Sequence, residues 1–298
     1  MSRVGVYLLL GVLWLLQWLP MPALVALGRG LGGLLYRVGR SRRRIGRRNL
    51  ALCLPELPDA EREAVLREHF ALLGRSLLER ALLWWAPRAR IERLIEVVGD
   101  VDLAERTFRE SGRPTMWLCP HFLGLDVAGA SVLLFQKQPV ASIYQSQSNA
   151  VVDEAMRKGR IRWGNATIFP RSDSVKPLLR AIKQGHVFFN LPDMDFGARD
   201  AAFVPFFGVP AATLLAPSRM ANMLDMVVQP VIAELLPGGR GYRVHFLPPL
   251  DGFPTDNAEA DALHMNQFIE AQIRQRLPQY LWVHKRFKTR PEGQPGLY

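Results

Sequence analysis

Short apolar segments alternate with helical patterns from about residue 91 onward, and this alternation constrains the fold more than any other feature. The segments are rich in β-branched or aromatic residues, as buried strands are: IEVVG, TMWLC, VASIY, ATIF, HVFFNL, MVVQPVIAEL, YRVHFL and LWVHK. Strands that alternate with helices predict an α/β fold, in which helices flank the faces of a sheet. The Gly-rich turn from Pro237 to Gly241 predicts a hairpin between the last two long strands, so we expect a mixed sheet.

A long uncharged run opens the chain. No charged residue occurs in the 25 residues from Val4 to Gly28, and a helix needs roughly 17–25 residues to cross the hydrocarbon core of a bilayer. The sequence therefore predicts an amino-terminal hydrophobic membrane anchor helix. We expect it to be retained, because the run is too long for a signal peptide and lacks a good cleavage site. Pro20 and Pro22 leave open a kinked helix that lies in one leaflet.

Arginines follow this run directly. Seven of the twelve residues from Arg37 to Arg48 are arginine, which places this side of the anchor on the cytoplasmic face. The cluster is either a topology signal alone or also a site for anionic lipid head groups. A long amphipathic helix is predicted from Asp59 to Trp85. We expect a membrane anchor over residues 1–36, a basic segment and amphipathic helix over 37–90, and an α/β domain over 91–298.

Composition and charge narrow the function classes. The chain is 49% hydrophobic with a formal charge of +11, which excludes global disorder and favours an anionic partner. Nucleic acid is not the expected partner, because a membrane anchor and scattered aromatic residues argue against it. Cys53 and Cys119 have no C-x-x-C spacing, and the six histidines show no recurrent ligand spacing, so we expect neither a disulfide nor a metal site.

One histidine and one carboxylate stand out in MWLCPHFLGLDVAG. His121 follows the predicted strand TMWLC, and Asp126 falls where the next helix begins. In open α/β sheets, ligands bind at such strand ends. If the two residues meet, the carboxylate holds the imidazole in the tautomer whose other nitrogen can accept a hydroxyl proton. The alternative is a structural histidine, because His-x4-Asp often arises by chance.

Direct acyl transfer is the chemistry that suits this pair. Backbone N–H groups at the adjacent helix start would favour negative charge developing on a thioester carbonyl oxygen. A transfer reaction in which a base activates the alcohol, and nearby donors stabilise the oxyanion, needs neither a protein nucleophile nor a cofactor.

Several longer segments carry a family resemblance. They are RRNLALCLPELPDAERE, CPHFLGLD, DMDFGARDAAFVPFFGVPAAT and HKRFKTRPEGQP. With them, the chain resembles the lysophospholipid acyltransferase superfamily, and more narrowly the lauroyl/myristoyl acyltransferase family of lipid A biosynthesis. The resemblance runs from about Leu9 to the end and implies a glycerolipid acyltransferase-like sheet flanked by helices.

The resemblance also implies an activity. Such enzymes move a fatty acyl chain from acyl carrier protein to a hydroxyl of an acyl chain on a phosphorylated glycolipid acceptor, a lipid A precursor. By this resemblance His121 is the general base and Asp126 its orienting partner, and no cofactor is needed. The location implied is the inner (cytoplasmic) membrane, with the catalytic domain on the cytoplasmic face.

Two further residues are expected to bind substrate. Arg171, in IFPRSDSVKPLLRAIKQG, matches the superfamily arginine that helps bind a phosphorylated acceptor, although no Asp precedes it as in the glycerolipid enzymes. Asp193, in NLPDMDFG, either binds a substrate amide or hydroxyl or caps the turn that Gly197 closes. The apolar run Phe203–Phe207 is expected to pack in the core, with lining of an acyl groove as the alternative.

Two other functions remain open at this point. The first is acylation of a glycerophospholipid or another glycolipid, because the same dyad can activate any alcohol. The second is a non-catalytic lipid-binding membrane protein in which His121 has only a structural role.

Overall fold

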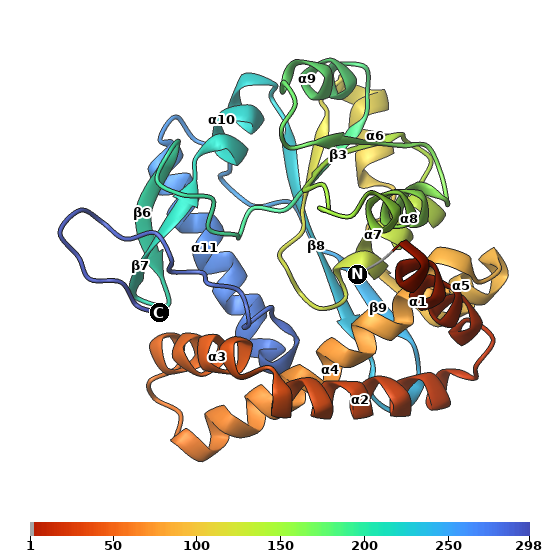
Figure 1. The fold of residues 1–298 in the computed structure, drawn as a ribbon. Helices are drawn as coiled ribbons and strands as arrows, with labels where there is room; N and C mark the ends of the chain where they lie inside the picture. Colours follow the sequence, from red (N-terminus) through yellow and green to blue (C-terminus); the bar gives the residue numbers. More distant parts are fainter. Residues whose placement is uncertain (1–2) are drawn as a thin grey trace.

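The computed structural model describes residues 3–298 and has an α/β architecture built on one mixed sheet (Figure 1). The seven strands run in the order β1-β9-β8-β2-β5-β3-β4. Their bounds are β1 Ile95–Gly99, β2 Thr115–Leu118, β3 Val140–Tyr144, β4 Ala166–Pro170, β5 Val187–Asn190, β8 Val227–Leu235 and β9 Tyr242–Phe246. All neighbouring pairs are parallel except β8 and β9, which the predicted turn joins as an antiparallel hairpin. The predicted mixed sheet is therefore confirmed.

Helices cover both faces of this sheet. They are α4 Asp59–Trp85, α5 Arg88–Leu94, α6 Leu103–Ser111, α7 Leu125–Leu134, α8 Ala150–Ile161, α9 Lys176–Lys183, α10 Ala216–Met223 and α11 Ala258–Gln275. Side chains alternate across the pleat of β2, so Trp117 joins one hydrophobic cluster while Met116 and Leu118 join the other. Both faces of β2 are fully buried, as expected for a central parallel strand.

The expected amino-terminal membrane anchor helix is wrong. No helix within residues 3–298 is both long enough and apolar enough to span a bilayer. The uncharged run divides into α1 (Arg3–Leu16) and α2 (Met21–Val38), because Pro20 cannot continue a helix. The 14 residues of α1 reach about 21 Å, short of a hydrocarbon core of about 30 Å, and α2 carries Arg29 and Arg37.

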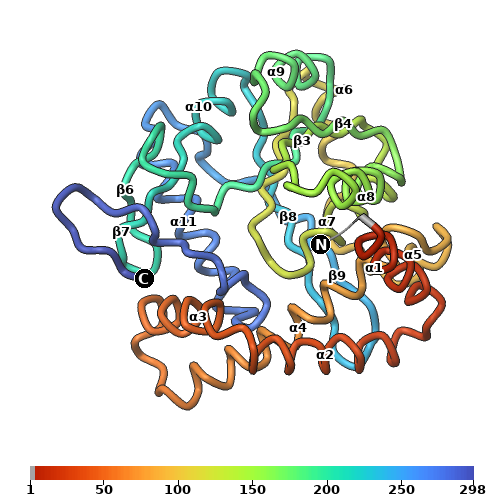
Figure 2. The backbone as a smooth tube through the Cα atoms, viewed as in Figure 1, coloured from red at the N-terminus to blue at the C-terminus, as the bar shows by residue number. Residues whose placement is uncertain are grey.

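Helix α2 instead packs along α4, and the two run side by side in Figures 1 and 2. Glycines make this close approach possible. A Cβ atom at Gly32 would lie 2.1 Å from the Phe70 carbonyl oxygen, and one at Gly74 would lie 2.1 Å from the Gly28 carbonyl oxygen. A third helix, α3 (Arg40–Cys53), carries most of the predicted arginine cluster and also contacts α4.

Two segments differ from the sequence-based expectation. The predicted strand LWVHK, residues 281–285, forms turns, and only an isolated bridge joins the preceding Tyr280 to Phe122. Ala201–Phe206 (β6) and Val209–Leu214 (β7) form a separate antiparallel hairpin that packs on α11. Its two-residue turn, Phe207 and Gly208, has positive φ at both positions, whereas Asn-Gly or Asp-Gly is the usual sequence signal for such a turn.

Candidate active site

The site forms where two neighbouring parallel strands end. Strands β2 and β5 pair in a register that sets Leu118 opposite Asn190, the last residue of each strand. Each strand is followed by a residue, a proline and a polar side chain: Cys119-Pro120-His121 after β2, and Leu191-Pro192-Asp193 after β5. The two polar side chains therefore leave the same edge of the sheet at matching positions.

His121 and Asp193 are hydrogen-bonded to each other. The Nδ1 atom of His121 lies 2.7 Å from Oδ1 of Asp193, and the backbone N–H of His121 donates to Oδ2 of Asp193 at 2.9 Å. Both carboxylate oxygens thus hold one histidine. An ionised carboxylate can only accept hydrogen bonds, so Nδ1 carries the proton and Nε2 is left as the nitrogen able to accept one.

Asp193 is buried, and its environment keeps it ionised. Burial alone would raise the pKa of this carboxyl, but the charge and hydrogen bonds of His121 outweigh it and lower the pKa below its usual value. Burial raises the pKa of the Tyr280 hydroxyl, and the nearby charge of Asp193 raises it further. The Asp193 side chain has no exposed surface, whereas 17% of the His121 side chain is exposed.

Asp126 holds two arginines. Its Oδ2 accepts from Arg80 Nε of α4 at 2.8 Å, and its Oδ1 accepts from Arg160 Nε of α8 at 3.0 Å. Burial alone would raise the pKa of Asp126, but the charges and hydrogen bonds of Arg160 and Arg80 hold it well below the usual value. The residue predicted to orient His121 is therefore hydrogen-bonded to cations from two other helices.

One open cleft collects the predicted residues. His121, Asp126 and Arg171 all line it, together with Arg80 and Arg160, and its empty volume is about 1510 Å³ including the mouth. Arg171 follows β4, donates its backbone N–H to the Tyr144 carbonyl at 2.9 Å and stacks on the Phe196 ring at 3.9 Å from the centroid. Asp193 lies behind His121 rather than on the cleft wall.

The carboxyl-terminal segment holds the Asp193 loop in place. Asp195, two residues on, accepts from the backbone N–H of Thr289 and from its hydroxyl, both at 2.7 Å. The backbone N–H of Asp195 donates to Nε2 of His284 at 3.1 Å, and burial lowers the pKa of that histidine to about 4. In the basic stretch that follows, Arg286 is buried and donates to the Ala212 carbonyl at 2.8 Å, a structural contact.

Sequence reasoning missed two features of this site. The first is the pairing of His121 with Asp193, for which the repeated proline-polar ending of two adjacent strands was an available signal. The second is the arginine pair, Arg80 of α4 and Arg160 of α8, because the sequence patterns of these helices do not indicate that both arginines bind one carboxylate. Within residues 3–298, no group of three or more His, Cys, Asp or Glu side chains is placed to hold a metal ion.

Comparison with known proteins extends these findings. The family model for bacterial lipid A biosynthesis acyltransferases matches residues 1–289. The lipid A biosynthesis lauroyltransferase of Escherichia coli (strain K12) is 37% identical over 97% of this chain and 93% of its own length. The lipid A biosynthesis palmitoleoyltransferase of that organism is 33% identical over 97% of this chain and 92% of its own length. The lipid A biosynthesis myristoyltransferase of that organism is 31% identical over 93% of this chain and 83% of its own length.

The family model covers nearly the whole chain. The resemblance noted in the sequence is thereby confirmed. The chain belongs to the bacterial lipid A biosynthesis acyltransferase family and is an acyltransferase.

Proposed function

We propose that this enzyme transfers a fatty acyl chain from acyl carrier protein to a hydroxyl of an acyl chain on a phosphorylated lipid A precursor, with His121 as general base. The observation that carries the proposal is the 2.7 Å contact between His121 Nδ1 and Asp193 Oδ1 at the edge of the cleft. Asp193 is the orienting partner of the base, in place of Asp126.

The reaction needs no covalent enzyme intermediate. Nε2 of His121 takes the proton of the acceptor hydroxyl while its oxygen attacks the thioester carbonyl carbon. The tetrahedral intermediate then collapses, the C–S bond breaks, and the departing thiolate recovers that proton. A positioned base of this kind contributes roughly 10²–10⁴-fold to the rate.

The two arginines held by Asp126 provide positive charge where the thioester oxygen becomes an anion. Arg80 and Arg160 each use Nε on the carboxylate, and both side chains line the cleft that contains His121. Groups fixed before the reaction stabilise developing charge without reorganising. The role proposed for Asp126 is therefore to fix these arginines.

Arg171 is proposed to bind a phosphate of the acceptor. Its guanidinium is exposed, stacks on Phe196 and lies on the same cleft as His121. A stacked arginine keeps its planar N–H edge free, and that edge suits bidentate binding of phosphate.

A bilayer surface is the proposed place of action, on the cytoplasmic face of the inner membrane. Helix α1 exposes large apolar side chains, including Tyr7 at 61%, Leu8 at 66% and Leu15 at 58%, with Trp18 at 65% just beyond. Arg40 and Arg44 of α3 are exposed as well. Exposed apolar side chains and exposed arginines both suit a surface of anionic lipid, and the net charge of +11 suits an acidic carrier protein.

The test is direct acyl transfer with purified enzyme. Lauroyl- or myristoyl-acyl carrier protein is incubated with a bis-phosphorylated tetra-acyl disaccharide, and products are followed by mass spectrometry. Wild type is expected to add the mass of one acyl chain, and His121→Ala, shown to be folded by circular dichroism, is expected to do so roughly 10²-fold more slowly or slower still. Gly33→Ala, at an exposed position of α2, is the matched control and keeps the wild-type rate.

The rival functions give different results in this assay. Faster acylation of lysophosphatidate than of the disaccharide would assign the enzyme to glycerophospholipids. Absence of transfer to either acceptor by folded wild type, from any donor, would contradict the proposal and favour a lipid-binding protein in which His121 is structural.

A further inference from the structure

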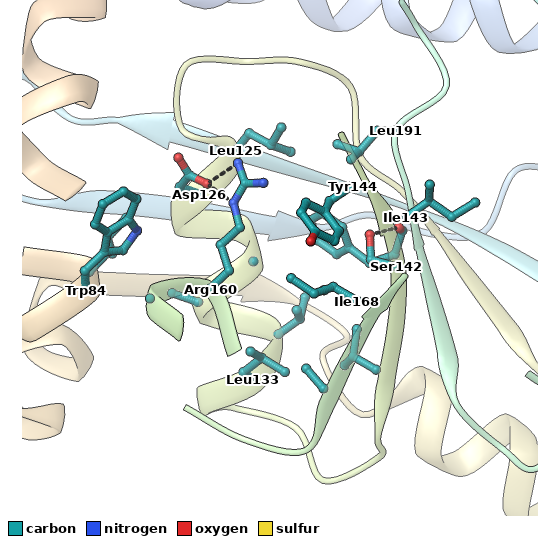
Figure 3. A pocket seen from close by; sticks show the side chains of 18 residues that line it. Trp84, Leu125, Asp126, Leu133, Ser142, Ile143, Tyr144, Arg160, Ile168 and Leu191 are labelled. Atoms are coloured by element: carbon teal, nitrogen blue, oxygen red, sulfur yellow. Dashed lines mark hydrogen bonds and ion pairs between the residues drawn. The ribbon is translucent and has the colours of Figure 1, made fainter. Parts of the chain in front are cut away.

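An apolar pocket opens between α4, α7, α8 and the strands β3 and β4 (Figure 3). Its empty volume is about 730 Å³, which includes open solvent at the mouth. Aliphatic and aromatic side chains such as Leu133, Ile168 and Trp84 form most of the wall. The charged groups among the lining residues are Asp126 and Arg160.

These two charged residues mark the end of the pocket that meets the His121 cleft. Asp126, Arg160, Leu125, Ile143 and Leu191 line both spaces. The ion pair is visible beside Leu125 in Figure 3, while Leu133 and Ile168 lie away from it. The pocket thus has one charged end, at the site of chemistry, and a mostly apolar remainder in which the Ser142 hydroxyl is bonded to the Phe189 carbonyl.

A fatty acyl group has the same division, with a thioester at one end and methylenes along the rest. We propose that this pocket holds the acyl chain of the donor and that Gly129 of α7 determines how long a chain it accepts. This inference rests on the proposed acyl transfer. The aromatic segment Phe203–Phe207, the other candidate for an acyl groove, does not line the pocket.

Two glycines shape the pocket in opposite ways. A Cβ atom at Gly159 of α8 would lie 2.3 Å from Cδ1 of Trp84, so this glycine lets the indole close one side. At Gly129, which also lines the pocket, an added Cβ atom would have no neighbour within 4 Å. A side chain at position 129 can therefore grow into space that the methylenes would occupy.

The test is a graded series, Gly129→Ala, Gly129→Leu and Gly129→Phe, assayed with acyl carrier protein loaded with chains of 10, 12, 14 or 16 carbons. Each methylene that loses its place lowers kcat/KM by about fourfold. Gly129→Leu adds four carbons, so the kcat/KM ratio of the 10-carbon to the 14-carbon donor is expected to rise roughly 200-fold over wild type. Replacing a helical glycine also favours the helix, so these variants are expected to fold.

Gly33→Leu is the matched control, because it makes the same change at an exposed helical position with no neighbour within 4 Å. Binding of a fluorescent undecanoic acid derivative, measured without acceptor, gives a readout independent of transfer. It is expected to weaken from Gly129→Ala to Gly129→Phe and to be unchanged in Gly33→Leu.

Different results would overturn the pocket assignment and the proposed acyl transfer. If Gly129→Leu and Gly129→Phe are active and prefer donors in the same order as wild type, the pocket assignment is wrong. The proposed acyl transfer would not be affected by that result. If wild type binds the fluorescent acid and the Gly129 variants bind it more weakly, but wild type transfers no acyl chain, the pocket assignment stands and the proposed function is wrong.

Discussion

His121 and Asp193 are 72 residues apart in the chain and meet at 2.7 Å because their strands are neighbours in register. Asp126, only five residues from His121, holds Arg80 and Arg160 instead. Proximity in sequence therefore does not decide which carboxylate serves the imidazole. The pairing of two strand ends decides it.

The arginine pair of Asp126 should be measurable as coupling in the free energy of unfolding. In double-mutant cycles, Asp126→Asn with Arg160→Gln, and Asp126→Asn with Arg80→Gln, are expected to couple by about 0.5–1 kcal/mol, allowing for partial solvent exposure. Asp126→Asn with His121→Ala is expected to be additive within about 0.5 kcal/mol. Chemical denaturation at pH 7 provides the measurement. Stronger coupling of Asp126 with His121 than with Arg80 and Arg160 would contradict the described contacts.

Arg171→Ala is expected to raise KM for the bis-phosphorylated acceptor about tenfold and to change kcat little. The reason is that a hydrogen bond to a charged group contributes about 1.5–3 kcal/mol, reduced here by exposure. The loss should shrink at high salt. Initial rates against acceptor concentration give the answer, and an equal loss with an acceptor that lacks phosphates would argue against a phosphate contact.

Acid should weaken the fold through His69 at pH values well above those that protonate carboxylates. His69 is buried with Nδ1 3.1 Å from the Pro278 carbonyl, and burial lowers its pKa to about 4. Between pH 6.5 and 4 the unfolded histidine binds a proton that the native one does not, so the free energy of unfolding falls as the pH drops through this window.

The size of this effect is up to about 3 kcal/mol for one histidine. His69→Asn keeps a donor for Pro278 but cannot titrate, and it is expected to flatten the dependence on pH relative to wild type. Denaturation midpoints at pH 7 and 4.5 compare the two. Part of the pH dependence of the free energy of unfolding should remain in His69→Asn, because burial also lowers the pKa of His284 to about 4.

The packing of α2 on α4 makes opposite predictions for two glycines one position apart. Gly32→Ala forces a methyl group against the Phe70 carbonyl and is expected to cost about 1–3 kcal/mol of stability. Gly33→Ala meets no atom within 4 Å and is expected to be neutral or stabilising by up to about 1 kcal/mol. Thermal unfolding in mild detergent compares them, and equal melting temperatures would mean that α2 does not pack as described.

Patterns within single elements predicted much of the fold. The helix expected from Asp59 to Trp85 is α4 with those bounds, and the Gly-rich turn at Pro237 joins β8 to β9 as expected. The amino terminus was misjudged because Pro20, expected at most to kink a single membrane helix, divides the uncharged run from Val4 to Gly28 between two separate helices. The small residues of α2 reflect helix packing, which a hydropathy window does not detect.

The site was harder to predict because it depends on which elements become neighbours. His121 and Arg171 were predicted from the sequence and lie on one cleft, since each follows a strand whose end lies at the same edge. The partner of His121 depends on β2 pairing with β5, and the partners of Asp126 depend on how α4 and α8 pack around α7. A single sequence states neither arrangement.

The most direct test of the account is a double-mutant cycle on the rate of acyl transfer, with the mass of one acyl chain as readout. Residues that act as a unit in catalysis are strongly non-additive. His121→Ala, Asp193→Asn and the double variant are therefore expected to lose activity to a similar extent, each roughly 10²-fold or more. Near wild-type turnover in folded Asp193→Asn, with Asp126→Asn non-additive with His121→Ala instead, would contradict the account and restore Asp126 as the partner of the base.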